Sequence, residues 1–443
     1  MIDLQSDLGP ERALLIGVHT ARSDYWRMEE SLEELGELVR SAGGEVASKA
    51  FQRVESPHAA CYIGKGKAEE LSKVANDCGA LAVVFDDELS PVQARNLERI
   101  FSRKVIDRTQ LILDIFAQRA RSREGKIQIE LAQLNYLLPR LTRMWTHLSR
   151  QKGGIGTRGP GETQLEIDRR RIEERIARLE RELAEARRHR EVQRRGRARH
   201  QWPICTLVGY TNAGKSTLMN RLTRSDVYAA DQLFATLDPT IRQFRLPSQH
   251  PVLLCDTVGF LRKLPHHLVE AFQATLEEVT HTDLLIHVVD VSHSQYERHI
   301  EAVDEVLKRI HAGEKQTLMV FNKIDRLQNR YFVERLLETY PHAVGISALT
   351  GEGMEDFFSE LDQMLNSWMK KVRIRIPQGE GALLAEVHRH CRVWETRYDG
   401  DDVILLVHLP PLLQGRLKGY ILPDHDAHSR DAGERAPSGA TVG

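Results

Sequence analysis

The chain has 443 residues, of which 41% are apolar and 28% are charged, and its formal net charge is −1. This length suffices for about three domains, and the composition is that of a folded protein rather than a disordered or polycationic one. Because the total charge is close to zero, binding to nucleic acid would require a locally basic segment.

Hydropathy and cysteine usage exclude further classes of protein. The sequence contains no apolar run of about 18 residues, and its acidic N-terminus lacks the apolar core of an export signal. The cysteines are odd in number, widely spaced and without a C-x-x-C pair, which argues against disulfides and zinc. They are Cys61, Cys78, Cys205, Cys255 and Cys391. We therefore expect a cytoplasmic protein without integral membrane association.

Residues 1–125 alternate strand-like and helical patterns, which predicts a small α/β domain. The strand-like runs begin at Ala13 and Ala80, and the helical runs begin at Met28, Ala68 and Pro91. Residues 64–67, with the sequence Gly-Lys-Gly-Lys, precede a helix but lack the full spacing of a phosphate-binding loop. They are either a phosphate-binding turn or a glycine turn with solvated lysines.

Residues 126–200 show two long helical patterns separated by a glycine-rich loop, which predicts an antiparallel helical hairpin. Arms of roughly 25 residues, at about 1.5 Å per residue, would carry this loop about 35–40 Å from the body of the protein. Apolar residues recur at spacings of three and four in both arms: Leu131, Leu134, Leu138, Leu141, Trp145 and Leu148 in the first, and Ile172, Ile176, Leu179, Leu183 and Ala186 in the second.

The tip of this hairpin, residues 153–161, lies in a basic segment. Between Pro139 and Pro160 there is no acidic residue, and the basic residues are Arg140, Arg143, Arg150, Lys152 and Arg158. Such a finger suits penetration of folded RNA, because cations neutralise phosphates and glycines permit close backbone approach. The alternative is a solvated surface hairpin, and the same two interpretations apply to the basic run 187–199.

Residues 209–216 match the phosphate-binding loop G-x-x-x-x-G-K-[ST] and follow an apolar strand-like run at 204–208. In such a loop the backbone N–H groups surround the α- and β-phosphates, Lys215 reaches the β- and γ-phosphates, and Ser216 ligates Mg²⁺. The next helix directs its positive end at the same anion. We assign nucleotide contacts to Gly209, Tyr210, Thr211, Asn212, Ala213, Gly214, Lys215, Ser216 and Thr217.

Further motifs follow in the order of a guanine-nucleotide switch protein. Asp256 would hold Mg²⁺ through water, the Gly259 N–H would contact the γ-phosphate, and Thr236 is the candidate switch threonine on Mg²⁺ and γ-phosphate. Asp325 would accept hydrogen bonds from the N1–H and amine of guanine, which adenine cannot supply. The motif residues are Phe234, Ala235, Thr236, Leu237 and Asp238; Asp256, Thr257, Val258 and Gly259; Asn322, Lys323, Ile324 and Asp325; and Ser347, Ala348 and Leu349, whose backbone would pack against the base.

The motifs and their flanking strands predict an α/β P-loop GTPase domain over residues 201–371, with a doubly wound, mainly parallel sheet. Its strands are expected at 204–208, 252–256, 284–290, 317–322 and 343–347. A helical stretch and a strand-like stretch predict a small α+β appendage at 372–424. The tail, 425–443, has a composition typical of disorder.

With these motifs the chain resembles the HflX family of bacterial translational GTPases, in the Obg-HflX superfamily. The signatures are residues 209–217, 231–240, 159–163 and 62–67. The resemblance implies a monomeric GTPase that binds GTP, GDP and Mg²⁺ and splits stalled ribosomes during heat or antibiotic stress. Its partner would be the large ribosomal subunit and its RNA, with the hairpin loop reaching toward the peptidyl-transferase centre. It also implies ATP binding and RNA remodelling by the N-terminal domain, although the sequence shows no complete ATP motif.

Two positions bear on catalysis, which we otherwise assign to Lys215, Thr236 and Gly259. Many GTPases carry a water-orienting glutamine after the D-x-x-G motif, but here the residue is Phe260, so slow intrinsic hydrolysis is expected. The water would be ordered by a ribosomal group, by Arg262 or His266, or by a monovalent cation. Asn212 resembles the asparagine of K⁺-dependent GTPases; its other interpretation is a loop-stabilising turn residue.

Two other functions fit the same residues. One is a GTPase of RNA modification or ribosomal subunit assembly, in which the hairpin grips tRNA or a maturing subunit. The other is a scaffold that binds GTP without turning it over. Binding to mature rather than precursor subunits separates the first alternative from a ribosome-splitting GTPase, and multiple-turnover phosphate release excludes the second.

Overall fold

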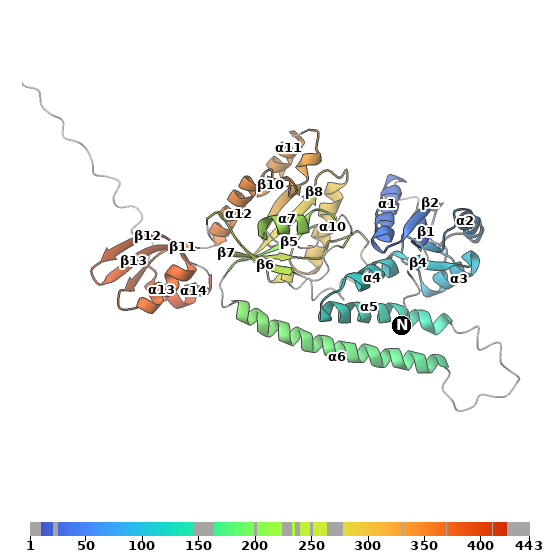
Figure 1. Cartoon of the computed structure of the whole chain (residues 1–443), viewed down its shortest axis with the longest axis horizontal. Helices are drawn as coiled ribbons and strands as arrows, with labels where there is room; N and C mark the ends of the chain where they lie inside the picture. Colours follow the sequence, from blue (N-terminus) through green and yellow to red (C-terminus); the bar gives the residue numbers. More distant parts are fainter. Residues whose placement is uncertain are drawn as a thin grey trace, which may run out of the picture.

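The computed structural model places an N-terminal sheet domain, a nucleotide domain and a C-terminal unit side by side, with a helical hairpin along one flank (Figure 1). Among the helices that the structure describes, none combines the length and apolarity required to cross a membrane. The residues described are 10–20, 25–144, 164–198, 202–223, 233–234, 240–248, 251–263, 278–329, 331–368, 370–409 and 411–422.

The N-terminal domain has a four-stranded parallel sheet in the order β2-β1-β3-β4. Helices cover both faces, and two apolar clusters lie on opposite sides of the sheet. Neighbouring residues of β3 alternate between them: Val84 belongs to one cluster and Val83 and Phe85 to the other. The elements are β1 (Arg12–Thr20), α1 (Tyr25–Ser41), β2 (Glu45–Val54), α2 (Lys65–Asp77), β3 (Ala82–Phe85), α3 (Pro91–Phe101), β4 (Lys104–Asp107) and α4 (Arg108–Arg119).

The long helices α5 (Arg123–Met144) and α6 (Gln164–Ala198) pack against each other, as the apolar stripes predict. Ile127 on α5 forms an apolar cluster with Leu179 and Leu183 on α6. Arg175 donates two hydrogen bonds to Glu130 across the pair, at 2.7 and 2.9 Å. The predicted tip at 153–161, with Trp145, Leu148, Arg150, Lys152 and Arg158, lies outside the described residues.

The nucleotide domain has a six-stranded sheet in the order β10-β9-β8-β5-β7-β6, parallel except for the edge strand β6. This agrees with the predicted α/β class and adds one strand, β6, that the apolar pattern did not indicate. The elements are β5 (Ile204–Val208), α7 (Lys215–Thr223), β6 (Thr240–Arg245), β7 (Pro251–Asp256), β8 (Leu284–Asp290), α10 (Tyr296–Arg309), β9 (Thr317–Asn322), η2 (Ile324–Arg326), α11 (Tyr331–Thr339), β10 (Ala343–Gly345) and α12 (Met354–Trp368).

The C-terminal unit is a three-stranded antiparallel sheet in the order β11-β13-β12, with two helices. Its first strand begins at Lys370, so the boundary predicted between residues 371 and 372 falls inside β11. The elements are β11 (Lys370–Pro377), α13 (Gly381–His390), β12 (Arg392–Asp399), β13 (Asp402–Leu409), α14 (Pro411–Leu417) and η3 (Lys418–Tyr420).

Candidate nucleotide-binding site

The phosphate-binding loop connects β5 to α7 and needs glycine at two positions for steric reasons. Gly209 has a φ of +149°, and a Cβ on it would lie 2.2 Å from the Val288 carbonyl oxygen. Gly214 has a φ of +96°, and its Cβ would lie 2.2 Å from Asn322 Nδ2. Any side chain at either position would therefore collide with a neighbouring strand end and displace the loop.

Lys215, the first residue of α7, folds back over this loop. Its Nζ donates to the carbonyl oxygens of Gly209 at 3.0 Å and Tyr210 at 2.7 Å. The side chain is buried, and this burial lowers the pKa of Lys215 to about 8, although the nearby Asp256 carboxylate acts in the opposite direction. The ammonium group is thus held among backbone dipoles where the sequence predicts that phosphates bind.

Ser216 and Asp256 bring two oxygen donors together from different elements. Ser216 Oγ donates to Asp256 Oδ2 at 2.8 Å, and Asp256 is fully buried at the end of β7. A hydroxyl and a carboxylate in contact beside a phosphate-binding loop form a donor set suited to Mg²⁺, a hard cation that prefers oxygen. The residues present therefore fit the predicted metal.

The D-x-x-G segment lies directly against the phosphate-binding loop. The Phe260 N–H donates to the Gly209 carbonyl at 3.1 Å, and the Thr211 N–H donates to the Phe260 carbonyl at 2.9 Å. A Cβ on Gly259 would lie 2.8 Å from Thr211 and 3.1 Å from Lys215 Nζ, so only glycine fits beside the lysine. The two intervening residues are also buried, and Thr257 Oγ1 donates to the Leu207 carbonyl at 2.6 Å while Val258 packs in an apolar cluster.

Phe260 itself is a core residue. It is 2% exposed and belongs to an apolar cluster with Val208, Val279 and Leu285. Its ring therefore occupies the interior of the domain, in agreement with the expectation that it takes no part in ordering water.

At the other end of the site, hydrogen bonds of the Asn322 side chain connect three motifs. Its Nδ2 donates to the Ala213 carbonyl at 2.8 Å, and its Oδ1 accepts from the Ala348 N–H at 2.9 Å. Lys323, with a φ of +66°, forms an ion pair with Asp290 at 2.7 Å. The amide side chain thus connects the phosphate-binding loop to the segment predicted to pack on the base.

The predicted base-recognition residues lie at the rim of this arrangement. Asp325 is exposed on η2, after Ile324, and Leu349 is 70% exposed. Ser347 is buried, and its Oγ accepts from the Thr350 N–H at 3.1 Å. Asp325 is therefore open to solvent in this structure, so burial of its carboxylate would require the bound base itself.

Tyr210 extends the site toward the N-terminal domain. Its hydroxyl donates to Glu34 on α1 at 2.9 Å and accepts from the Arg262 N–H at 3.0 Å. Its ring stacks on His299, with the centroids 3.9 Å apart and the planes at 6°. Burial lowers the pKa of His299 to about 3, so the stacked imidazole is neutral near pH 7.

A charged cluster continues this contact at the carboxyl end of β3. Arg108, which is buried, donates to Asp86 at 2.8 Å and to Glu34 at 2.6 Å. Lys263, which follows the D-x-x-G segment, pairs with Asp86 and with Asp87 at 2.8 Å. Burial raises the pKa of Asp86, but Arg108 and Lys263 outweigh it and hold that pKa below its ordinary value. The two cations therefore keep Asp86 ionised.

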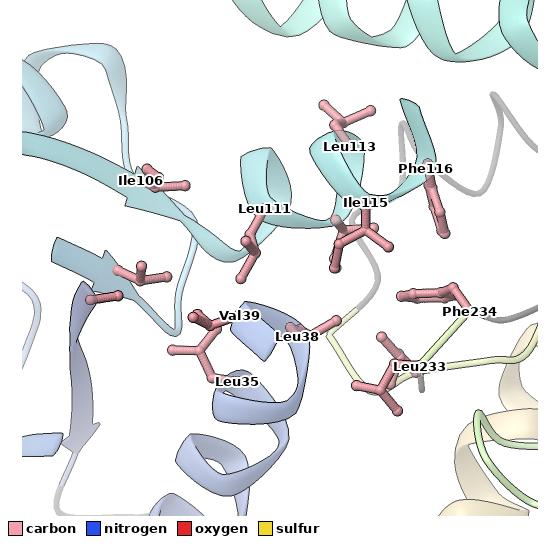
Figure 2. Packing of buried hydrophobic residues seen from close by; sticks show 14 of the residues in the cluster. Leu35, Leu38, Val39, Ile106, Leu111, Leu113, Ile115, Phe116, Leu233 and Phe234 are labelled. Atoms are coloured by element: carbon pink, nitrogen blue, oxygen red, sulfur yellow. The ribbon is translucent and has the colours of Figure 1, made fainter. Parts of the chain in front are cut away.

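Apolar contacts join the same two domains (Figure 2). Phe234 packs edge-on against Phe116 of α4 with the ring centroids 4.4 Å apart, and Leu233 belongs to the same cluster as Leu38 of α1. The Leu233 N–H also donates to Ser41 Oγ at 3.3 Å. The segment before Thr236 is therefore anchored on the N-terminal domain.

Several predicted residues require comment. Ala235, Thr236, Leu237, Asp238 and His266 lie outside the described residues. Arg262, a candidate for ordering the attacking water, instead pairs with Glu34 at 3.5 Å, so in this conformation it is bound to the N-terminal domain. Asn212 is exposed in the loop with a φ of +60°.

Sequence reasoning missed the residues that join the domains: Glu34, Asp86, Asp87, Arg108 and Lys263. The only local signal was the position of Asp86 at the end of a strand-like run, and no motif connects it to Lys263, 177 residues away. The structure also bears on the two interpretations of residues 64–67. Lys67 pairs with Glu70 at 2.6 Å, and Lys65 pairs with Glu69 at 3.9 Å. These pairs favour the solvated-lysine interpretation.

Comparison with known proteins adds to this geometry. Family models match three consecutive parts of the chain: the N-terminal region of a GTP-binding GTPase at 29–117, the middle region of a GTP-binding GTPase at 119–197, and a 50S ribosome-binding GTPase at 204–323.

Relatives match over nearly the whole length. GTPase HflX of Magnetococcus marinus is 46% identical, covering 94% of this chain and 97% of its own. GTPase HflX of Escherichia coli is 45% identical, covering 92% and 95%. Among solved structures, a GTP-binding protein from Sulfolobus solfataricus in complex with GDP is 27% identical, with a TM-score of 0.44, and the match covers 80% of this chain and 98% of that one.

Proposed function

Because the chain belongs to the HflX family of GTPases and hydrolyses GTP, we propose that it binds the large ribosomal subunit and its RNA and uses GTP to split stalled or idle ribosomes under heat or antibiotic stress. The family model that matches residues 204–323 describes a 50S ribosome-binding GTPase, which supports this partner.

The observation that carries the proposal is the docking of both switch segments on the N-terminal domain. Leu233 and Phe234 precede the candidate switch threonine, while Arg262 and Lys263 follow Gly259, and all four contact α1, α4 or the end of β3. A rearrangement around the γ-phosphate would therefore move against the domain from which the hairpin α5–α6 projects. A change of bound nucleotide could therefore change the position of the hairpin.

In the proposed mechanism Lys215 carries the charge that faces the β- and γ-phosphates, and the Gly259 N–H donates to the γ-phosphate. Ser216 and, through water, Asp256 would hold Mg²⁺, with Thr236 as its switch ligand. The metal would neutralise charge that develops between the phosphates. Asp325 would select guanine through its two acceptor oxygens.

Water activation is the open step in this mechanism. Phe260 is buried in the core and Arg262 is bound to Glu34, so neither orients water in this conformation. We propose that a ribosomal group or a K⁺ ion held by Asn212 takes that role, because Asn212 is exposed on the loop where such an ion would bind beside the phosphates.

The test uses the basic hairpin tip. Arg150, Lys152 and Arg158 are changed together to alanine, and sedimentation and light scattering then follow ribosome binding and splitting with a non-hydrolysable GTP analogue. We expect GTP affinity to survive and splitting to be lost, with the salt slope of subunit binding reduced by roughly 0.7 to 0.9 for each lost phosphate contact.

A matched control removes three exposed arginines from α6, Arg170, Arg178 and Arg181. Its charge change is the same, so its splitting activity should remain. Normal splitting by the tip variant, with an unchanged salt slope, would contradict the role of the tip. Sedimentation of the wild type with precursor subunits alone would favour a GTPase of subunit assembly instead.

ATP binding by the N-terminal domain receives no support from the described residues. Ligands of parallel α/β sheets bind at the carboxyl ends of the strands, at the point where the strand order reverses. In the order β2-β1-β3-β4 this point lies between β1 and β3, and the residues that follow β3 are Asp86 and Asp87. These carboxylates repel phosphate and are engaged by Lys263.

A further inference from the structure

The C-terminal unit has the chain order of a split β-α-β fold. The elements run β11, α13, β12, β13, α14, and β13 lies between β11 and β12 in the sheet. After α14 the chain returns to the free side of β11: Ile421 forms an antiparallel bridge with Ile374, and the Leu422 N–H donates to the Arg373 carbonyl at 2.8 Å. The spatial order is therefore that of the four-stranded sheets that RNA-recognition modules use, with the fourth strand reduced to one bridge.

One face of this sheet is closed by its helices. Ile374 and Ile376 of β11 and Val403, Leu405 and Val407 of β13 are buried in a cluster that includes residues of α13 and α14. Figure 1 shows α13 and α14 together beside the sheet, at the end of the molecule beyond α12. Because side chains alternate along a strand, the intervening residues project from the other face.

That other face combines arginines with apolar side chains. Pairing places Arg373 opposite Leu406, and both Arg375 and Arg397 opposite Ile404. The arginines are exposed, and Ile404 and Leu406 are half-buried between them.

Trp394 adds an aromatic ring to this face. The register shifts between Val393, opposite Val407, and Glu395, opposite Leu406, so Trp394 is the extra residue of a β-bulge. Trp394 lies between Val393, which packs in the core, and Glu395, which is on the open face, and its side chain is 48% exposed. Bulges commonly re-aim a side chain.

Carboxylates engage one of the three arginines on this face and leave the other two without an ion pair among the described residues. Arg375 is paired with Asp399 at 2.5 Å and with Asp402 at 3.7 Å. Among the described residues, by contrast, Arg373 and Arg397 form no ion pair with a carboxylate. Three acidic side chains lie on the same face: Asp399 and Asp402, which engage Arg375, and Glu395. Two guanidinium groups thus flank an apolar strip with their charge available.

From this arrangement we propose that the open face of β11, β13 and β12 binds an unpaired segment of RNA. Arginine binds phosphates and stacks on bases through its planar group, and Trp394 offers a second stacking surface. The face differs from aromatic-rich RNA-binding sheets, because its central strands present Arg373, Leu406 and Ile404. The assignment of this RNA to the ribosome rests on the proposed function; the binding chemistry does not.

The experiment measures binding of a fluorescent uridine 12-mer to the full chain by anisotropy over a range of salt concentrations. The Arg150, Lys152 and Arg158 to alanine variant is the parent, so that the hairpin tip does not mask the C-terminal contribution. In that parent, Arg373→Ala with Arg397→Ala should weaken binding about tenfold and reduce the salt slope by roughly 1.4, at about 0.7 for each lost contact with a single strand. Trp394→Ala should weaken it by roughly tenfold as well.

Matched controls come from the helix side of the same unit. Arg416→Ala with Lys418→Ala removes two exposed cations from α14 and η3, and Tyr398→Ala removes a 70% exposed aromatic that pairs opposite the buried Val403. Both should bind the 12-mer as the parent does. Circular dichroism and thermal unfolding establish that every variant is folded.

Two results would overturn the inference. One is equal loss of binding in the sheet variants and their controls, which means non-specific attraction. The other is unchanged 12-mer binding together with weaker binding to intact large subunits, which means that the face docks on a protein. Loss of ribosome splitting has no bearing here: a wild type that binds the 12-mer through this face but splits no ribosomes contradicts the proposed function and leaves the RNA face in place.

Discussion

The two mainly parallel sheets of this molecule present opposite chemistry at the carboxyl ends of their strands. In the nucleotide domain the edge carries the buried ammonium of Lys215, a loop of backbone N–H groups and one buried carboxylate, Asp256, in contact with a serine hydroxyl. In the N-terminal domain the corresponding edge carries Asp86 and Asp87, and it binds Lys263 from the switch segment of its neighbour. The first edge suits a polyanion with its metal, and the second suits a cation.

This difference shows that a shared architecture does not imply a shared ligand. The strand ends of both sheets offer a crevice, but the side chains placed there decide what enters it. At the strand ends of the N-terminal domain the bound group is Lys263 of the same polypeptide. This edge of the sheet therefore serves as a contact between the domains. The two edges are joined through Tyr210, whose hydroxyl contacts both Glu34 and the Arg262 backbone.

The largest effect is expected at the phosphate-binding edge of the nucleotide domain. Lys215→Ala removes a buried charge that faces the phosphates, and loss of one member of such a pair costs about 2–5 kcal/mol, or roughly 30-fold to several thousandfold in affinity. Titration with a fluorescent GTP analogue measures this loss. Lys73→Ala, at an exposed position on α2, is the control and should bind as the wild type does. Tight GTP binding by the Lys215 variant would contradict the claim that this edge of the nucleotide domain binds phosphates.

The next effect concerns the choice of base. Asp325→Asn replaces an acceptor-only carboxylate with an amide that also donates, which should weaken GTP and favour xanthosine triphosphate. Because Asp325 is exposed before the base arrives, solvent competes for its hydrogen bonds, and we expect a loss of about tenfold to a hundredfold. Competition between the two nucleotides in one assay measures the switch. Unchanged preference for GTP would remove Asp325 from base recognition.

A third effect tests the cation at the same edge. Replacing K⁺ by Na⁺ should slow GTP turnover of the wild type by roughly tenfold, because the ion would supply charge beside the phosphates. Asn212→Ala should be slow in both salts, since it lacks the side chain that would hold the ion. Multiple-turnover phosphate release measures both, and equal wild-type rates in the two salts would refute the K⁺ hypothesis.

The cationic contact of the N-terminal edge should contribute less. A double-mutant cycle of Lys263→Met and Asp86→Asn is expected to give a coupling of about 1 kcal/mol in the free energy of unfolding, because Lys263 remains 43% exposed and solvent screens the pair. At pH 7 the coupling should be complete, since the lowered pKa of Asp86 keeps it ionised. Lys73→Met with Asp86→Asn is the control cycle and should show no coupling. Zero coupling would mean that the Lys263–Asp86 pair adds nothing to the contact between the domains, which would then rest on the apolar cluster and the other polar contacts.

Local patterns predicted which residues come together beside the phosphate-binding loop, because these residues lie in short segments at strand ends. Lys215, Ser216 and Asp256 come together as the spacing indicates, and β5, β7, β8 and β9 follow their apolar runs. The contacts that the GTP motifs imply for Thr236 and Asp325 stay predictions. The water-orienting role of Arg262 also stays a prediction. Its ion pair with Glu34 was not foreseen, because Glu34 lies far away in the sequence and no local pattern indicates it.

Several of the elements that sequence reasoning missed have one-sided or weak burial, although β4 and α4 were missed despite their buried residues. β6, with the sequence Thr-Ile-Arg-Gln-Phe-Arg, is an edge strand with one buried residue, Phe244, so its apolar signal is faint. β2 has no fully buried position, and β12 is polar along most of its length. Such strands are selected by pairing with neighbours that a linear pattern does not specify.

The smallest effect is expected at Phe260, the residue that stands where many GTPases carry a catalytic glutamine. Because its ring is 2% exposed and packs with Val208 and Val279, Phe260→Ala would create a cavity that costs about 3–5 kcal/mol and would confuse stability with catalysis. Phe260→Leu keeps the position apolar and filled, so basal turnover per folded molecule should stay within about twofold of the wild type, since no hydrogen bond to water is removed. Phe357→Leu, at a fully buried position on α12, is the matched control for general loosening of the core. If the Phe260 variant turns over GTP far more slowly while the Phe357 variant does not, the ring shapes the site directly, and the search for the water-activating group must begin with Phe260 rather than with the ribosome or K⁺.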